Sequence, residues 1–432
     1  MTDISQSTQV DAPARAGAGR WRTVFGTGIG NALEWYDWNV YAVFAPFFAS
    51  QFFPKSDATS ALLSTLAIFA VGFLMRPLGG LFFGWLGDRK GRRTAMVASI
   101  AMAAGGSLVI GIAPTYDTIG IGASLLLLLA RLGQGLAHGG ELPAAQTYVS
   151  EMAPPGRRGR WSSLIYVSGT IGITVGTALG AVLASALVPA ELAAWGWRIP
   201  FVVGGIIGVY ALVMRMRLAE TEAFEHDDAA RTKISLWQAF WQNRIACLKV
   251  IGLTLGGTVV YYTWFVAAPA QAISVKGFDP SATLWVAVAA NVVFICALPF
   301  FGALSDKIGR KPVLQFAFIG GAVLTFPLNW LVQDQVWQLA AAMFIAMLFM
   351  APASAILPAV YAEMFPTHVR TTGVAIPYAI AVAACGGSAP YLQTWLTKAG
   401  AGSVFLTYTV ALLLLAVLVV RGMPETKDVD LT

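Results

Sequence analysis

One ten-residue stretch occurs twice in this chain: it reads G-W-L-G-D-R-K-G-R-R at 84–93 and G-A-L-S-D-K-I-G-R-K at 302–311. The glycines at both ends of the turn, the aspartate and the closing pair of basic residues keep their places in the two copies. A second pair lies at a similar offset, because E-M-A-P at 151–154, followed by Arg158, matches E-M-F-P at 363–366, followed by Arg370. The repetition predicts a chain built from two structurally related halves.

The composition predicts that most of this chain is surrounded by lipid. Its 432 residues are 57% hydrophobic and only 12% charged, whereas a soluble domain carries about 25% charged residues. The mean hydropathy is +0.68. The three cysteines, Cys247, Cys296 and Cys385, lie far apart inside apolar stretches, without the spacing of metal ligands. We therefore interpret them as packing residues and expect no metal site.

Twelve apolar segments can be delimited, and most are long enough to cross about 30 Å of hydrocarbon as helices. They lie near 23–50, 58–83, 94–113, 118–150, 161–188, 197–218, 245–272, 281–303, 312–332, 335–364, 368–397 and 402–421. The fourth is longer than a bilayer requires, so we expect its end to project into the cytoplasm. The predicted fold is an all-α membrane protein with twelve transmembrane helices in two six-helix halves. The expected parts are an N-terminal tail (1–22), a first half (23–218), a linker (219–244), a second half (245–421) and a short C-terminal tail (422–432).

The net charge of +6 is distributed as membrane topology requires, and not as a nucleic-acid-binding surface. Basic residues cluster in alternate loops, near 89–93, 157–160, 215–244 and 307–311, while the other loops carry only Lys55, Arg198, Lys276 and Lys398. By the positive-inside rule, both termini are predicted to be cytoplasmic. Residues 1–20 are polar and lack the apolar core of a signal peptide, so we expect the first transmembrane helix to direct insertion.

The first apolar segment carries a polar stripe that membrane insertion alone would disfavour. Asn31, Glu34 and Tyr41 recur at helical spacing, and Asp37 follows Glu34 by three residues. An ionised aspartate at mid-membrane costs about 2.5–3.5 kcal/mol, so both carboxylates must face a cavity, have a cationic partner or hold a proton. We predict that Asp37 and Glu34 take part in proton coupling. The alternative is that they make hydrogen bonds between packed helices.

The fourth segment carries Arg131, Gln134, His138 and Glu141 at a spacing that would place all four on one helical face. Arg131 lies about thirteen residues from the outer end, hence near the bilayer centre at about 1.5 Å per residue. We expect it to need an anion there, either Asp37 or a substrate carboxylate. Ionised Asp37 would pair with Arg131, and protonation would release the guanidinium. The alternative is a permanent salt bridge, and Glu141 is a further candidate for proton coupling.

Several other residues are candidates for the wall of a central cavity. Arg76 is expected near the cytoplasmic end of the second segment, so Arg131 is predicted to be the basic residue at the midplane. Each polar or aromatic candidate could equally be a packing residue, and Arg198 a topology anchor. The predicted substrate-binding residues are Arg131, Asn31, Tyr41, Gln134, His138, Tyr166, Thr170, Tyr261, Tyr262, Trp264, Asn291, Tyr378 and, steering anions at the outer mouth, Arg198.

The repeated loops are predicted to act as a gate. An aspartate at a helix junction can pair with a nearby arginine or with the partial charges of a neighbouring helix end, which makes a contact that can break. Such a latch on the cytoplasmic side would favour a state open to the outside. The predicted gating residues are Gly84, Asp88, Arg92, Asp306, Arg310, Glu151, Glu363 and Arg370.

Several strings carry a family resemblance that extends from about residue 26 to residue 420. The stretch at 84–93 and R-L-G-Q-G at 131–135 resemble signatures of the major facilitator superfamily. G-N-A-L-E-W-Y-D-W at 30–38, F-L-M-R-P-L-G-G at 73–80, G-G-E at 139–141 and W-G-W-R-I-P at 195–200 are similar to the metabolite:proton symporters within it. The resemblance implies the major facilitator fold, a multi-pass protein of the bacterial inner membrane, proton coupling, and cargo among organic acids and osmolytes.

We therefore predict a symporter, not an enzyme, that imports a small organic anion with protons by alternating access. A di- or tricarboxylate such as 2-oxoglutarate is the expected cargo. The alternatives are uptake of a zwitterion, an osmolyte or an aromatic acid, a proton-driven exporter, and a sensor that does not transport. The glycine-rich strings lie in apolar helices and not after strands, so no nucleotide site is expected. No cofactor or nucleic acid is expected as a partner, and the protein is expected to be a monomer in the lipid bilayer.

Overall fold

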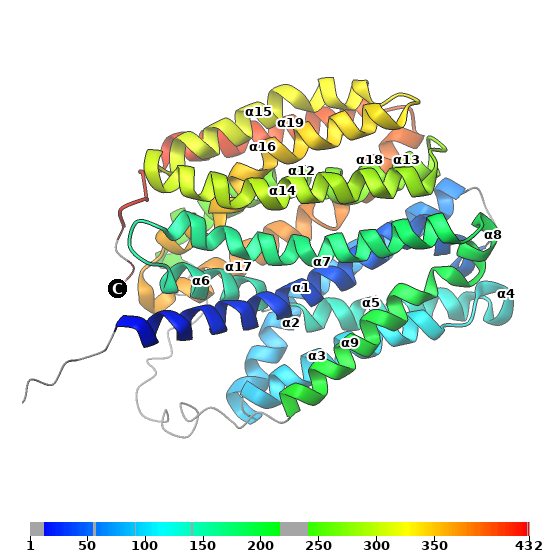
Figure 1. Ribbon diagram of the computed structural model, residues 1–432, viewed down its shortest axis with the longest axis horizontal. Coiled ribbons are helices and arrows are strands. Elements are labelled where there is room, and N and C mark those ends of the chain that lie inside the picture. The colour runs from blue at the N-terminus through cyan, green and yellow to red at the C-terminus, as the bar shows by residue number, and fades with distance from the viewer. Residues whose placement is uncertain are drawn as a thin grey trace, which may run out of the picture.

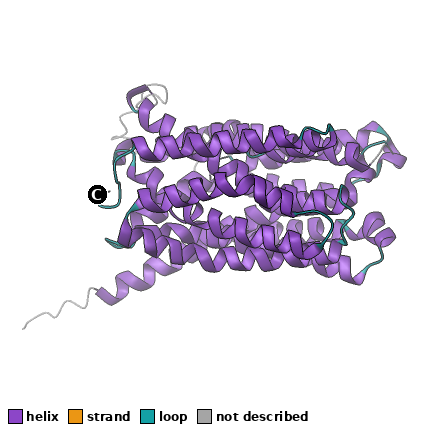
Figure 2. Cartoon of the chain, turned by 90° about the horizontal axis from the view of Figure 1, so that it is seen from above, coloured by secondary structure: helices purple, strands orange, loops and turns teal. Residues whose placement is uncertain are grey.

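The computed structural model describes residues 13–54, 58–90, 92–139, 141–216, 241–429 and 431. Throughout this part of the chain the regular structure is helical, and the long helices run side by side along the longest axis of the molecule (Figures 1 and 2). The first helices are α1 (Pro13–Phe52), α2 (Ala58–Lys90), α3 (Arg92–Ile112), α4 (Tyr116–Ile119), α5 (Ile121–Ala137), α6 (Glu141–Met152), α7 (Arg158–Ala186), α8 (Pro189–Glu191), η1 (Leu192–Gly196) and α9 (Arg198–Met216). The later ones are α12 (Arg244–Tyr262), η2 (Thr263–Ala267), α13 (Ala268–Ser274), α14 (Pro280–Ile308), α15 (Arg310–Leu331), α16 (Val336–Glu363), η3 (Thr367–Val369), α17 (Arg370–Cys385), α18 (Ser388–Lys398) and α19 (Gly402–Gly422).

Ten helical segments of the described chain are long and apolar enough to cross a membrane. They coincide with ten of the twelve predicted segments. The other two predicted segments fall on α1, which carries the acidic residues Glu34 and Asp37, and on α5 with α6. The helical membrane fold is thus confirmed, while a complete set of twelve crossings stays a prediction.

The predicted segment at 118–150 is not one helix, and this corrects part of the sequence interpretation. Helix α5 ends at Ala137 and α6 begins at Glu141. Gly139 lies in this break, and glycine disfavours a helix interior. The backbone of Gly139 also packs directly against the backbone of α2. A Cβ atom at Gly139 would lie 2.0 Å from the carbonyl oxygen of Arg76. Glu141 therefore starts a new helix and does not extend the face of Arg131, Gln134 and His138; its side chain lies outside the described residues.

The first part of the chain, from α1 to α9, packs against the second part, from α12 to α19, along two seams. Helix α7 packs against α14 and α16, and α2 packs against α17 and α18. The first seam is closest at a pair of glycines, because a Cβ atom on Gly159 would come within 2.6 Å of the carbonyl oxygen of Gly302. Small residues at such crossings let helix backbones approach in a membrane. The seams bring α7 and α14 into direct contact, as Figure 1 also shows.

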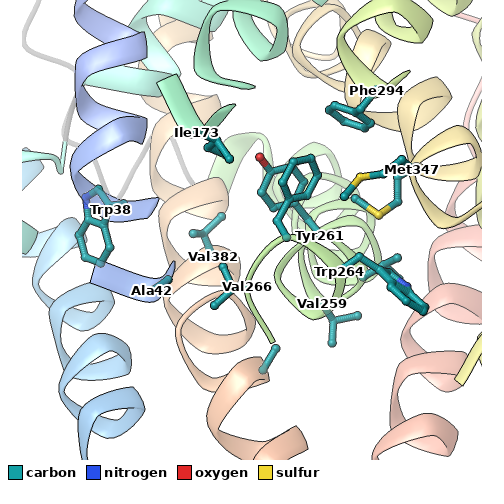
Figure 3. Packing of buried hydrophobic residues seen from close by; sticks show 14 of the residues in the cluster. Trp38, Ala42, Ile173, Val259, Tyr261, Trp264, Val266, Phe294, Met347 and Val382 are labelled. Atoms are coloured by element: carbon teal, nitrogen blue, oxygen red, sulfur yellow. The ribbon is translucent and has the colours of Figure 1, made fainter. Parts of the chain in front are cut away.

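The interior of the bundle is rich in aromatic side chains, whereas large apolar side chains also cover the outside. Figure 3 shows four of these aromatic side chains, Trp38, Tyr261, Trp264 and Phe294, which come from different elements of the bundle. On the outside, Trp330 is 66% exposed, among many exposed aliphatic residues. An outer surface this apolar suits contact with lipid and not with water.

The start of α1 and the C-terminus lie at the same end of the bundle, which we call the termini end (Figure 1). This placement agrees with an even number of crossings. The sequence predicts that the termini end is cytoplasmic. Most of the predicted linker at 219–244 and of the predicted N-terminal tail lies outside the described residues, so the domain boundaries stay predictions.

Candidate functional site

A cavity of about 100 Å³ lies in the interior between the two parts of the chain. Residues of α1, α2, α6 and α7 line one side, and residues of α12, η2, α15, α16, α17 and α19 line the other. Five predicted substrate-binding residues line it: Tyr166, Tyr261, Tyr262, Trp264 and Tyr378. Figure 3 shows how Trp38, Ile173, Tyr261 and Val382 surround this interior from different helices.

A π-helical turn positions the aromatic side of the cavity. Helix α12 passes at Thr263 into the turn η2, and α13 begins at Ala268, with Pro269 in its first turn. Turns of this kind are rare and often occur at functional sites. Tyr261 stacks on Phe265, with ring centroids 4.3 Å apart, and meets Trp35 of α1 edge-on at 5.6 Å. The aromatic wall is therefore continuous across the two parts of the chain.

Next to the cavity, side chains of α1, α3 and α5 form a hydrogen-bonded relay. Gln134 Nε2 donates to Asp37 Oδ2 at 2.7 Å and to Ser107 Oγ at 2.9 Å, and Arg131 donates to Gln134 Oε1 at 2.9 Å. The Ser107 hydroxyl also donates to Asp37. Gly106 leaves room for this arrangement, because a Cβ atom there would come 2.5 Å from Gln134 Cγ. We call Asp37, Ser107, Gln134 and Arg131 the relay.

The relay changes the predicted relation between Asp37 and Arg131. We expected ionised Asp37 to pair directly with Arg131, but no ion pair joins these two described side chains, and Gln134 bridges them. The reason is local geometry, since Gln134 lies one turn beyond Arg131 on the same helix. His138 lies 3.8 Å from both Glu34 Oε1 and Asp37 Oδ2, so these three titratable groups meet near the end of α5.

Arg131 is fully buried and is held by aromatic rings. Its guanidinium carbon lies 4.1 Å from the centroid of the Trp38 ring and 4.2 Å from that of Tyr41. Such contacts stabilise a cation in a poorly hydrated place. Two of its nitrogens, Nε and one Nη, are buried and lack a hydrogen-bond partner among the described residues. Trp38 lines the cavity and covers Arg131, which itself does not line it.

Arg76 is the residue of the site that the sequence interpretation misplaced. It lies near the middle of α2 and not close to its end, and it lines the cavity. Its guanidinium carbon lies 4.3 Å from the ring centroids of both Trp38 and Phe73. Of the described residues that line the cavity, Arg76 alone carries a charge. The available signal was an arginine followed by Pro77 in an apolar run, which a transmembrane helix seldom holds without a function.

Close backbone packing fixes the two arginines relative to each other. A Cβ atom at Gly135 of α5 would lie 2.0 Å from the carbonyl oxygen of Gly72 of α2, just as one at Gly139 would meet Arg76. Only glycine permits this approach. The close packing of α2 against α5 therefore fixes the position of Arg76 relative to that of Arg131.

The remaining predicted binding residues lie away from the cavity lining. Asn31 ties α1 to α7, because it donates to the carbonyl of Ile165 at 2.7 Å and to Ser168 Oγ at 2.9 Å. Arg198 donates to the carbonyls of Gly111 and Ala113 at the end of α3, which favours the anchor role over steering. The other three are buried: Tyr41, which donates to Thr65, and Thr170 and Asn291.

At the termini end, the predicted gating residues form an ion-pair cluster that joins the two parts of the chain. Buried Glu363 accepts from Arg158 at 3.0 Å and from Arg310 at 3.1 Å. Asp306 pairs with Arg310 at 2.8 Å and also accepts from the backbone N–H groups of Gly159 and Arg160 at 2.7 and 2.9 Å, at the start of α7. The second copy of the repeated stretch thus contacts both an arginine and a helix N-terminus.

A further ion pair completes this cluster, which we call the latch. Arg370 of α17 pairs with Glu151 of α6 at 2.7 Å. Five predicted gating residues, Asp306, Arg310, Glu151, Glu363 and Arg370, therefore lie in the latch. For the other three, Gly84, Asp88 and Arg92, the gating role stays a prediction, because their contacts lie outside the described part of the chain.

Comparison with known proteins agrees with this architecture. The family model described as the Major Facilitator Superfamily matches residues 27–279 and 253–431. Among solved structures, the partially occluded inward-open xylose transporter XylE of E. coli superposes with a TM-score of 0.72, covering 95% of this chain and 99% of that one at 19% identity. That likeness concerns the fold alone.

Three relatives are similar over most of their length. The alpha-ketoglutarate permease of Escherichia coli (strain K12) is 38% identical over 421 residues, which cover 97% of this chain and 96% of that protein. A putative proline/betaine transporter of Staphylococcus haemolyticus (strain JCSC1435) is 33% identical over 87% of this chain and 81% of its own. The citrate-proton symporter of Klebsiella pneumoniae is 32% identical over 91% of this chain and 89% of its own.

Proposed function

Because the chain belongs to the major facilitator superfamily of membrane transporters, we propose that it is a proton-coupled symporter for a small organic anion. The cargo we propose is a di- or tricarboxylate, the chemical class of the compounds for which two of the relatives are named. The two parts of the chain alternate access to the cavity between them. The proposed location is the bacterial inner membrane, with import toward the termini end.

The observation that carries the anion proposal is the charge of the cavity. Arg76 lines it, and no described lining residue is acidic. A cation on the wall of a poorly hydrated cavity attracts an anion and disfavours a cationic cargo. The remaining polar groups of the described wall are hydroxyls, amides and indole N–H groups, which can hydrogen-bond the oxygens of a carboxylate or a keto group.

The relay supports proton coupling. Ionised Asp37 accepts hydrogen bonds from Gln134 and Ser107, and a proton on Asp37 turns one of those acceptor atoms into a donor. The relay must then rearrange, and Gln134 is also the hydrogen-bond partner of Arg131. The charged or titratable groups that face Asp37 are Arg131, His138 and Glu34. Protonation at this place is therefore transmitted to a buried cation beside the cavity.

Cooperativity between anion and proton follows from the same charges. An anion at the cavity wall adds negative charge to a region that already holds Asp37, so uptake of a proton offsets the added charge. The coupling between two binding events is reciprocal. A carrier with this property moves the anion and the proton together.

A second candidate function is supported by the aromatic wall. Trp35 meets Tyr166 edge-on at 5.5 Å and Tyr261 at 5.6 Å, and such a cluster can bind a quaternary ammonium group. A zwitterion such as a betaine would place its carboxylate toward Arg76. One relative carries a betaine name, so betaines belong in the same ligand screen.

The test of the proposed function is transport by purified protein in liposomes with an imposed pH gradient. Asp37→Asn should abolish accumulation of 2-oxoglutarate or citrate against a gradient, because asparagine holds the site in a permanently uncharged form. Counterflow exchange, which needs no net proton movement, should continue. The control is Asp334→Asn, which removes an exposed carboxylate in the loop before α16 and should leave accumulation intact. Accumulation by Asp37→Asn at the rate of the unsubstituted protein would contradict the coupling role.

A further inference from the structure

Arg76 combines three properties of a ligand-binding cation. It lines the cavity, it is only partly buried, and its guanidinium makes no hydrogen bond or ion pair to any described residue. Two aromatic rings, those of Trp38 and Phe73, contact it at 4.3 Å. These contacts keep the guanidinium in place while leaving its N–H donors free for another acceptor.

Arg131 has the opposite properties. None of its surface is exposed, and it already donates to Gln134. Trp38 contacts both cations, with its ring centroid 4.1 Å from the guanidinium carbon of Arg131 and 4.3 Å from that of Arg76. One indole therefore lies next to the cavity cation and next to the cation of the relay.

From this division we infer that Arg76, and not Arg131, binds a carboxylate of the substrate, and that Trp38 separates this anion site from the proton site. The inference rests on the proposed function and assigns its binding step. The planar guanidinium offers a bidentate fork that matches a carboxylate. Arg131 then belongs to proton coupling alone.

The residues around Arg76 also indicate which chemical groups the other end of the ligand should carry. Phe73, which contacts Arg76, packs edge-on against Tyr262 at 5.3 Å, and Tyr262 lies beside Tyr261 at 5.5 Å. The Tyr261 hydroxyl is buried beside the hydroxyl of Thr170. A carboxylate on Arg76 thus leaves uncharged hydroxyl donors for the rest of the molecule. The site fits an anion with one carboxylate in a bidentate pair and oxygen acceptors at its far end.

Isothermal titration with 2-oxoglutarate, citrate and glycine betaine tests the assignment. Arg76→Gln should weaken binding of 2-oxoglutarate by about 30-fold or more, because it removes one partner of a poorly hydrated charge pair. Arg76→Lys should lose nearly as much, because an ammonium cannot form the fork. Arg131→Lys is the matched control, since it changes the other arginine that contacts Trp38. It should abolish proton-driven accumulation and weaken binding less than Arg76→Gln does.

A measurement on the unsubstituted protein guards against misfolded variants. Phenylglyoxal, which modifies accessible arginines, should label Arg76, and bound 2-oxoglutarate should protect it. Affinity of folded Arg76→Gln within about threefold of the unsubstituted protein, or a larger loss in Arg131→Lys, would overturn the inference. Arg76-dependent binding of betaine in place of the acids would support the site and overturn the dicarboxylate cargo. Failure of the unsubstituted protein to bind any probe would overturn the proposed cargo and, with it, the Arg76 assignment.

Discussion

At the scale of single residues, Gln134 has the most consequential position, because it links a carboxylate to a cation that do not touch. Its amide donates to Asp37 and accepts from Arg131 at the same time. An amide has a donor end and an acceptor end, so a proton gained by Asp37 favours turning the amide over. Turning it would place two donors against each other at Arg131 and break the hydrogen bond that Gln134 accepts from that guanidinium.

Gln134→Leu should therefore reduce the rate of proton-driven accumulation by about tenfold or more, the effect of losing a hydrogen bond to a charged group worth about 1.5–3 kcal/mol. Both Asp37 and Arg131 would lose a partner that leucine cannot replace. The measurement is the initial rate of uptake into liposomes under a pH gradient. Gln146→Leu is the control, because both polar side-chain atoms of Gln146 are buried without partners in the described structure. Equal uptake rates in the two variants would show that the amide does not transmit protonation.

The sequence predicted the residue types of the site better than their partners. The polar stripe at Glu34 and Asp37, and the basic residue at 131, followed from the cost of charge in lipid. That cost does not reveal which neighbour satisfies a charge, and so the bridging role of Gln134 and the contribution of Ser107 were missed. Arg76 was missed for a different reason: its depth depends on where α2 begins and ends, and helix boundaries are the least certain feature of an apolar pattern.

At the scale of elements, residues 425–429, which follow α19, contact the latch. We call this segment the strap. Glu425 accepts from the backbone N–H groups of Arg310 and Lys311 at 2.7 and 3.1 Å, at the start of α15. Thr426 donates to Glu363 at 2.6 Å, and the carbonyl of Val429 accepts from Arg158. A carboxylate at a helix N-terminus is stabilised by the free N–H groups and the helix dipole.

The strap should release at acid pH. Burial alone would raise the pKa of Glu425, but the N–H groups of Arg310, Lys311, Lys427 and Thr426 hold that pKa below its ordinary value. The Glu425 carboxylate therefore stabilises this contact fully at pH values above its ordinary pKa of about 4.3. That stabilisation is lost as the pH falls through the lower pKa of the folded protein.

Hydrogen exchange at the amides of 310 and 311 measures this contribution. Glu425→Gln should exchange about two- to fivefold faster than the unsubstituted protein at pH 7, as expected for a helix-terminal charge worth about 0.3–1 kcal/mol. The difference should shrink as the pH is lowered from 7 to below the ordinary pKa of about 4.3. Asp428→Asn removes an exposed charge from the same segment and should change neither rate. A difference between Glu425→Gln and the unsubstituted protein that persists at the lower pH would contradict this account of the strap.

At the scale of the whole molecule, the two ends of the bundle are closed by different chemistry. The termini end carries the latch, with ion pairs between α7 and α16 and between α6 and α17. The opposite end is joined by hydroxyl contacts and one ammonium, because Ser185 and Ser281 lie 2.6 Å apart and Lys398 donates to Ser60 at 2.8 Å. Alternating access requires each set of contacts to break in turn.

A covalent bond at the opposite end should therefore stop transport. Ser185→Cys with Ser281→Cys, in a protein whose three native cysteines are replaced by serine, should form a disulfide that holds α7 against α14. Uptake should fall to background after oxidation and recover with a reducing agent. Each single cysteine variant should keep its activity under both conditions. Full uptake by protein shown by mass spectrometry to be cross-linked would rule out separation at this end.

The two parts of the chain supply different groups to the site, and this difference affects how the substrate selectivity of the carrier can change. The relay and Arg76 come from α1, α2, α3 and α5, whereas α12, η2, α16 and α17 supply an uncharged wall. Mutations in that wall can reshape the binding pocket without altering the groups proposed to exchange protons. During evolution, related carriers can thus keep the same proposed proton-coupling residues and still come to accept different substrates.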